Sequence, residues 1–232
     1  GTYSNRGRVD MRRLSDPYQR MFSVLSGVAA LAILGSTMAK NPALPLLAKS
    51  IGANDAEVGL IAAVGPIPGI LISGFVGAYS DRIGRAPVLT SSLVIFATAP
   101  FMYLFVTDPW QLMLVRFYHG FATAAFMPVA MASVADWYSS RRRGEKLGTY
   151  SAATMVGRFI APFLGGALIY FANFASVYLT CAATGLLALA FSFAIPWKRG
   201  SSQGKSLNSG ASSLTSLRNV IGERRIMVTS SI

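Results

Sequence analysis

Charged residues and cysteine are both scarce in this chain of 232 residues. Only 13% of its residues are charged, whereas about 25% of the residues of a soluble domain are charged. Cys181 is the single cysteine, which excludes an internal disulfide and any cysteine-based metal site. The sequence also contains no Ser/His/Asp set, no metal-spaced His/Cys cluster and no phosphate-binding glycine loop. We therefore expect no enzyme, no metal or other cofactor, and no ATP-driven step within this chain.

Hydrophobic residues take the place of the missing charge. They make up 53% of the chain, and the mean hydropathy is +0.48. Uncharged apolar stretches cover residues 21–39, 58–80, 86–107, 117–135 and 159–195. A bilayer core about 30 Å thick requires roughly 20 apolar residues per helix, and the last stretch is long enough for two spans that meet at Asn173. The sequence therefore predicts an all-α membrane protein with six transmembrane helices.

The net charge of +12 is unevenly distributed along the chain. All but four of the 21 Lys and Arg lie in the N-terminal tail, in the second-to-third and fourth-to-fifth connections, or after the sixth span. Lys40 and Lys49 lie toward the opposite side, while Arg116 and Arg158 fall inside spans. This is the positive-inside pattern, so the partner of the basic residues is the lipid bilayer and not a nucleic acid. We expect an integral protein of the cell membrane with both ends of the chain cytoplasmic.

Composition divides the chain into four parts. Residues 1–18 form a polar cytoplasmic tail, and residues 19–197 form the six-helix transmembrane bundle. Residues 198–225 are rich in Ser, Gly, Asn and Lys, which is typical of a flexible linker. Residues 226–232 are apolar and follow a basic cluster, which predicts the truncated start of a seventh helix. Because the sequence also begins with glycine, we interpret it as a fragment of a longer protein.

Local signals place the helix ends. Pro42 and Pro45 are expected to kink the outer end of the first helix. Asn54 or Asp55 is expected to cap the second helix, with Glu57 in its first turn, and Asp108 to cap the fourth. The predicted third to sixth helices cover residues 87–105, 110–138, 145–171 and 174–197.

The connection after the second span is a short charged reversal with two glycines. Glycine permits close backbone approach and dihedrals that other residues avoid, and the charged side chains can form exchangeable ion pairs. The alternative interpretation is an ordinary charged turn. The residues of this motif are Gly77, Asp81, Arg82, Gly84 and Arg85.

Basic side chains lie inside two of the apolar spans. An arginine at the depth of Arg116 costs at least ~2.5 kcal/mol unless it is compensated, so it should face the bundle interior with a partner or solute. His119 and Gly120 follow in the same helix, and His119, three residues on, lies on a neighbouring part of the same face. Its alternative role is that of a hydrogen-bonded packing residue. Arg158, in the fifth span, is the other candidate for coupling or solute binding.

Small residues recur every fourth position in the fifth span. Such a stripe allows two membrane helices to pack closely, and by itself it indicates only a packed helix. Here it is combined with a proline and a double glycine. The residues of this packing motif are Gly157, Ala161, Pro162, Gly165 and Gly166.

These three motifs together resemble those of the major facilitator superfamily. The loop matches that family's G-x-x-x-D-R-x-G-R pattern, helix 4 its R-x-x-x-G pattern, and helix 5 the G-x-x-x-G-P-x-x-G-G pattern of its antiporter branch. Ala86 departs from the first pattern and Ala161 from the third. The resemblance implies the N-terminal half-bundle of a transporter whose C-terminal six-helix half is missing here, with the solute bound between the halves. It also implies a conformational-switch loop in which Asp136 pairs with Arg85, unless Asp136 belongs to a merely solvated charge run, and a role for Arg116 in proton coupling.

The expected function is secondary-active transport of a small solute by alternating access, in the form of proton-coupled efflux of a drug-like or organic compound. One alternative is an organic-anion transporter of the same fold, because Arg116 and Arg158 are both positive and no acidic residue lies mid-span. The other alternative is a non-transporting membrane subunit of a larger complex.

Overall fold

The computed structural model describes residues 16–197. The predicted linker at 198–225, the start of a seventh helix at 226–232 and nearly all of the tail at 1–18 lie outside these residues. Within them the chain forms eight α-helices and no strand. These helices make up six segments that are long and apolar enough to cross a membrane. The predicted fold class and number of spans are thus confirmed, and the chain is an integral membrane protein.

Two of the six spans are each built from two helices. The first span consists of α1 (Asp16–Met38) and α2 (Ala43–Ser50), and the second of α3 (Asp55–Val64) and α4 (Ile67–Ile83). The first break falls at Pro42, as predicted, and the second at Gly65–Pro66, which was not predicted. Both breaks have the same cause, because proline has no N–H to donate within a helix and its ring crowds the preceding turn.

The other four spans are single helices, namely α5 (Arg85–Tyr103), α6 (Pro109–Trp137), α7 (Ser140–Phe171) and α8 (Phe174–Ser192). The predicted caps are present. Asn54 accepts a hydrogen bond from the Glu57 N–H (2.9 Å) while the Glu57 side chain accepts one from the Asn54 N–H (2.8 Å). Asp108 accepts a hydrogen bond from Trp110 at the start of α6. These side chains satisfy N–H groups that have no partner inside the helix.

Two of the predicted helix bounds were wrong. The α7 helix begins at Ser140, five residues before the predicted start, so the run Arg141–Arg143 is helical. Arginine is a good helix former, and the side chain of Arg143 folds back to donate to the Ala135 carbonyl at 3.1 Å. At the other end of the bundle, α8 stops at Ser192 instead of continuing to Trp197.

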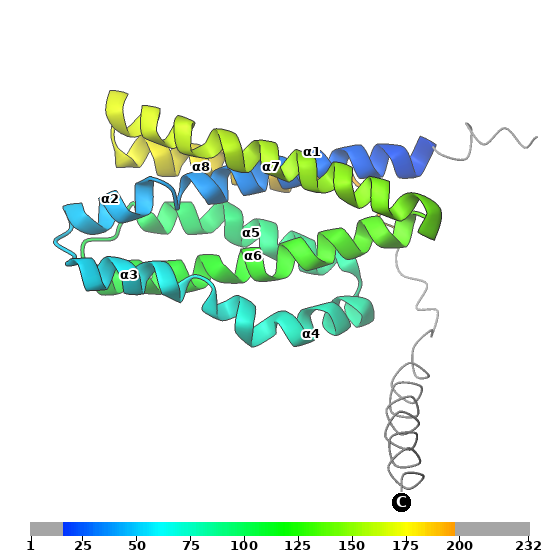
Figure 1. Cartoon of the computed structure of the whole chain (residues 1–232), viewed down its shortest axis with the longest axis horizontal. Helices are drawn as coiled ribbons and strands as arrows, with labels where there is room; N and C mark the ends of the chain where they lie inside the picture. Colours follow the sequence, from blue (N-terminus) through cyan, green and yellow to red (C-terminus); the bar gives the residue numbers. More distant parts are fainter. Residues whose placement is uncertain (1–15, 198–232) are drawn as a thin grey trace, which may run out of the picture. The chain divides into compact units, whose positions relative to one another are not determined.

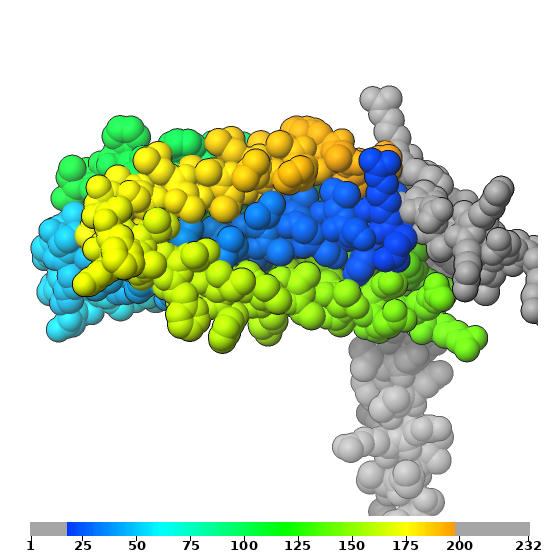
Figure 2. Space-filling model, turned by 90° about the horizontal axis from the view of Figure 1, so that it is seen from above, coloured from blue at the N-terminus to red at the C-terminus, as the bar shows by residue number. Residues whose placement is uncertain are grey.

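The helices are arranged around α1 and α6. Figure 1 shows α1, α7 and α8 on one side of the bundle, α5 and α6 in the middle, and α3 and α4 on the opposite side. Figure 2 shows α1, in blue, lying between α7 and α8. The α4 helix packs mainly on α6 and touches its sequence neighbour α5 far less. The second span is therefore held to the bundle chiefly by α6, the helix that carries Arg116.

Large apolar side chains are exposed along α4 and α7. Phe75 on α4 is 76% exposed, and Phe159 on α7 is 72% exposed. Contiguous apolar surface of this kind is rare on soluble monomers and marks a surface that contacts lipid or another protein. These two spans therefore have faces that the described residues leave uncovered.

Candidate functional site

The reversal between α4 and α5 is a single-residue turn at Gly84. Its φ of 99° lies in a region that residues with a Cβ rarely adopt, so a glycine is required here. The tight turn brings Arg85 close to three side chains. Its guanidinium donates to Asp81 (2.6 Å), to the Ser80 hydroxyl (2.6 Å) and to Asp136 at the end of α6 (3.2 Å). The pairing of Arg85 with Asp136, expected from the family resemblance, is therefore present.

These four residues, Ser80, Asp81, Arg85 and Asp136, are called the Arg85 cluster below. The side chains of Asp81 and Asp136 are each more than half exposed. Exposed ion pairs of this kind contribute about 0–1 kcal/mol each. The cluster therefore links α4, α5 and α6 through contacts that are weak enough to be exchanged.

Two residues predicted for the loop motif stay outside the Arg85 cluster. Arg82 makes no ion pair with any residue in the range 18–197. Gly77 has open space where a Cβ would project. The close approach predicted at Gly77 is thus not made by any part of the chain that the structure describes.

Arg116 lies in α6 against the α3–α4 break. Its side chain is buried, with only 7% of the residue exposed. A Cβ on Gly65 would lie 2.6 Å from its Nη2 atom. One turn further along α6, Gly120 faces the Gly65 carbonyl, and a Cβ on Gly120 would also come within 2.9 Å of Pro68. The unpredicted break and α6 therefore fit together at two glycines, and this fit positions the guanidinium.

A group of buried polar side chains surrounds Arg116. The Nδ1 atom of His119 lies 3.3 Å from the Tyr103 hydroxyl, and the Tyr103 ring stacks on Tyr178 at 4.7 Å between centroids. Arg116 Nε, His119 Nε2 and the Tyr178 hydroxyl have no hydrogen-bond partner among residues 16–197. A buried polar atom without a partner costs about 1–3 kcal/mol. His119 is therefore buried and bonded to Tyr103 through one ring nitrogen, an arrangement that fits both of its predicted roles.

The guanidinium of Arg116 lines a cavity of about 300 Å³ between the α1–α2 break, the α3–α4 break and α6. We call it the cationic cavity. Lys40 also lines it, and its Nζ donates to the Thr123 hydroxyl at 3.4 Å. No acidic side chain lines it. Its lining residues are Lys40, Gly65, Pro66, Gly69, Arg116, Gly120, Thr123 and Ala124.

Sequence reasoning missed Lys40 as a site residue. The sequence places it, with Lys49, toward the outer face, although it directly follows the apolar stretch at 21–39 and precedes the predicted kink at Pro42. Those two facts were the available signal for a lysine at membrane depth. Arg158, the other candidate for coupling or solute binding, is exposed on α7 and does not line the cationic cavity.

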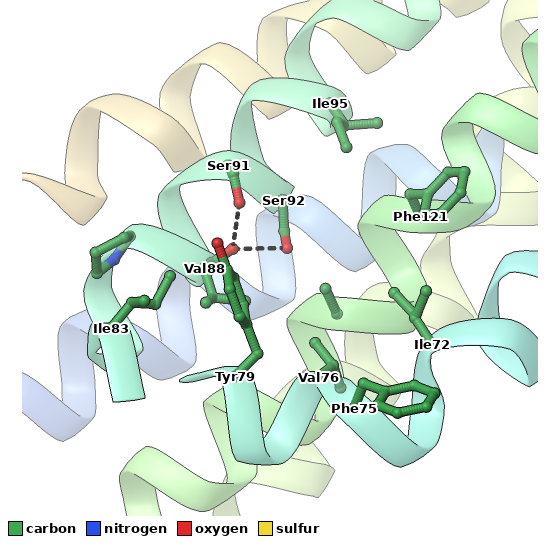
Figure 3. Close-up of a pocket in the computed structure, with 12 residues that line it drawn as sticks. Ile72, Phe75, Val76, Tyr79, Ile83, Val88, Ser91, Ser92, Ile95 and Phe121 are labelled. Carbon is green, nitrogen blue, oxygen red and sulfur yellow. Dashed lines mark hydrogen bonds between the residues drawn. The ribbon is translucent and has the colours of Figure 1, made fainter. Parts of the chain in front are cut away.

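A larger cavity of about 560 Å³ lies between α4, α5 and α6 (Figure 3). Its walls are apolar side chains such as Ile72, Phe75 and Phe121, and no charged residue lines it. The hydroxyls of Ser91 and Ser92 both donate to the Val88 carbonyl at 2.9 Å, so they are already used within α5. This cavity has no charged group with which to bind a charged solute. The cationic cavity contains the predicted candidate Arg116, so it is taken as the candidate site.

The packing motif of α7 lies against α1. A Cβ on Gly157 would come within 2.7 Å of the Ala30 carbonyl oxygen, and one on Gly165 within 3.1 Å of Met38. Ala161, between them, is fully buried. Gly166 has open space around it. The predicted stripe therefore does pack closely, whereas the second glycine of the pair points away from α1.

Taken together, the six spans, the breaks at two of them and the charges held inside the bundle define a polytopic, all-helical membrane protein with an internal polar site. The sequence profile of the Major Facilitator Superfamily matches residues 25–232. The chain belongs to this family.

Several curated proteins are similar in sequence. An uncharacterized MFS-type transporter of Methanocaldococcus jannaschii is 28% identical over 152 residues, and the quinolone resistance protein NorA of Staphylococcus aureus is 27% identical over 154 residues. Each match covers 66% of this chain and 39% of the other protein. The chain therefore spans well under half the length of these relatives.

A solved structure shows the same fold. The human organic anion transporter TETRAN superposes with a TM-score of 0.65 at 21% sequence identity. The match covers 76% of this chain and 47% of that protein.

Proposed function

We propose that this chain forms the N-terminal half of a secondary-active transporter that moves a small solute by alternating access. The observation that carries this proposal is the burial of Arg116 at the wall of a cavity, in a chain of the Major Facilitator Superfamily. A buried arginine inside a membrane bundle is costly, and such residues mark the paths of solutes and ions. A structural subunit without transport activity has no comparable need for it.

The uncovered faces of α4 and α7 support a second six-helix half. Their exposed aromatic side chains need either lipid or protein around them. In transporters built from two repeats, the solute site lies where the halves meet near the middle of the bilayer. A C-terminal half packed on α4 and α7 would close the cationic cavity on its open side.

The Arg85 cluster is our candidate for the conformational switch. Its members come from α4, α5 and α6 and are held by ion pairs that are partly exposed. Rocking of one half against the other requires contacts that exist in one state and are released in the other. The positive-inside pattern supports a cytoplasmic position for this cluster, and we propose the cell membrane as the location of the protein.

Proton-coupled efflux of a drug-like or organic compound is the transport mode that we propose first. Two features support it: the helix 5 motif, which resembles that of the antiporter branch, and the sequence similarity to a quinolone resistance protein. In this mode Arg116 takes part in coupling, and the buried Tyr103–His119 pair provides further polar groups inside the bundle.

Transport of an organic anion is the second candidate, and the cationic cavity favours it. Lys40 and Arg116 both line this cavity, and none of its lining residues is acidic. The fold similarity to a human organic anion transporter is compatible with this candidate, but at 21% identity it supports the fold alone.

Transport assays on the full-length protein in proteoliposomes test both candidates. We expect uptake of ethidium or of p-aminohippurate to depend on an imposed pH gradient and to vanish when the gradient is collapsed. Arg116→Ala should abolish this uptake, while Lys49→Gln, at an exposed residue paired with Asp55, should leave it intact. If neither ethidium nor p-aminohippurate is taken up, with or without the gradient, the proposed function is contradicted.

A further inference from the structure

We propose that Lys40 and Arg116, with Thr123 between them, form a two-cation subsite that binds an oxyanion of the solute, in particular a carboxylate. The inference deepens the proposed function, because it assigns the chemical class of ligand to the cationic cavity. It also assigns a role to Lys40, which the sequence motifs do not include.

The two cations approach the cavity from different helices. Lys40 comes from the α1–α2 break, where the chain leaves the helical path, so its side chain can reach across to α6. There its Nζ donates to the Thr123 hydroxyl at 3.4 Å. Arg116 lies two turns before Thr123 on the same helix, and both line the cavity. Residues seven apart fall on one face of a helix, so the charges of Lys40 and Arg116 face a common space.

Neither cation is neutralised by the described part of the chain. The ion pairs found between residues 18 and 197, whose side chains the structure describes, involve Lys49, Arg85 and Lys146, but not Lys40 or Arg116. The acidic residues in this range lie at helix caps or within the first or last two turns of helices, away from the middle of the spans. Two like charges that share a cavity repel each other, so an anion between them is stabilised by both.

The hydrogen-bonding capacity of the site matches an oxyanion. Only 7% of Arg116 is exposed, and its Nε atom has no hydrogen-bond partner among residues 16–197. A guanidinium presents its N–H groups in a planar fork that fits the two oxygens of a carboxylate. The lysine ammonium is a flexible point charge with three donors, of which the Thr123 hydroxyl takes one.

Space for the ligand comes from glycine. Gly65, Gly69 and Gly120 all line the cationic cavity and contribute no side chain to it. The remaining lining residues apart from the two cations and Thr123 are Pro66 and Ala124, which are small and apolar. An anion with a compact apolar body can therefore reach both cations.

Binding of benzoate to the purified full-length protein tests this subsite, with benzamide as the neutral isostere. Both are titrated at constant ionic strength while thermal unfolding is followed by intrinsic fluorescence. We expect saturable stabilisation by benzoate and none by benzamide. Lys40→Gln should raise the apparent Kd of benzoate about tenfold or more, since it leaves the anion short of one buried charge partner.

Lys40→Arg keeps the charge and controls for folding, so it should retain the preference for benzoate over benzamide. Lys49→Gln should leave benzoate affinity unchanged, because Lys49 is exposed and paired with Asp55. Equal effects of benzoate and benzamide, or an unchanged benzoate Kd in Lys40→Gln, would overturn the subsite.

The same preparations separate this inference from the proposed function. Gradient-driven ethidium uptake without any Lys40-dependent benzoate binding would support the proposed transport function and overturn the proposed subsite. Lys40-dependent benzoate binding without gradient-driven uptake of ethidium or p-aminohippurate would support the proposed subsite and contradict the proposed transport function.

Discussion

The guanidinium of Arg116 occupies the space in which a side chain of Gly65 would lie. A Cβ on Gly65 would be 2.6 Å from Nη2 and 2.8 Å from Cζ of that arginine. The two residues are 51 positions apart, so the contact exists only because the α3–α4 break lies against α6. The placement of the buried charge therefore depends on a residue that carries no charge itself.

Gly65→Ala should displace the Arg116 side chain and impair gradient-driven transport. The clash is with the end of a flexible side chain and not with backbone, so the loss of stability should lie at the low end of the roughly 1–3 kcal/mol that an overpacked contact costs. Gly59→Ala is the matched control, because Gly59 is in α3 and a Cβ there meets nothing within 4 Å. An unaltered transport rate in Gly65→Ala would show that the rate of transport does not depend on the position of the Arg116 side chain.

Arg116→Ala should abolish coupled transport, and Arg116→Lys should restore little of it. Lysine keeps the charge but loses the planar fork that can hold two oxygens or bridge two partners. Initial rates of pH-driven uptake in proteoliposomes measure both variants at equal protein density. Full activity of the alanine variant would make Arg116 a structural charge at the α3–α4 break and not a coupling residue.

Asp81→Asn and Asp136→Asn should shift the balance between inward-open and outward-open states while leaving solute affinity within each state nearly unchanged. Each removes one partner of Arg85, and the expected shift is no more than about fivefold, because a partly exposed pair contributes roughly 0–1 kcal/mol. The rate of thiol labelling at Ala124→Cys, in a Cys181→Ser background, reports the state populations.

Arg82→Gln is the control for this pair of variants, since Arg82 makes no ion pair within residues 18–197. A larger effect at Arg82 than at Asp81 and Asp136 would argue that another part of the protein, and not the Arg85 cluster, holds the switch.

Gly157→Ala should destabilise the contact between α1 and α7. Its Cβ would lie 2.7 Å from the Ala30 carbonyl oxygen, and backbone atoms cannot move aside as a flexible side chain can. We expect a lower unfolding temperature, whereas Gly166→Ala on the same helix should be neutral or slightly stabilising, because alanine favours the helix and the space there is open. Equal unfolding temperatures of the two variants would contradict the close packing at Gly157.

Single cysteines test the proposed orientation in the Cys181→Ser background. An impermeant thiol reagent added outside intact cells should label Asn54→Cys and Asn173→Cys, which lie at connections on the proposed outer side. It should not label Arg82→Cys or Arg142→Cys, which lie on the side enriched in basic residues. Labelling of Arg142→Cys from outside would contradict the proposed topology.

Several features could be derived from the sequence because their causes are local. The six spans follow from the length of the apolar stretches, and the caps at Asn54 and Asp108 bond to residues two or three positions away. The stripe on α7 follows from helical periodicity alone. The Arg85–Asp136 pair joins residues 51 positions apart, and it was expected only because the loop and helix motifs resemble those of a known family.

Other features were decided by the tertiary structure. The place of Lys40 depends on Thr123, 83 residues further along the chain, and no local signal states which side chains an interhelical cavity will bring together. The break at Gly65–Pro66 positions Arg116 only when α3, α4 and α6 pack. Arg158 has the same local setting in an apolar span as Arg116, yet it lies on an exposed face of α7. Depth in the membrane can be estimated from sequence, but the direction in which a side chain points is set by the packing of the helices around it.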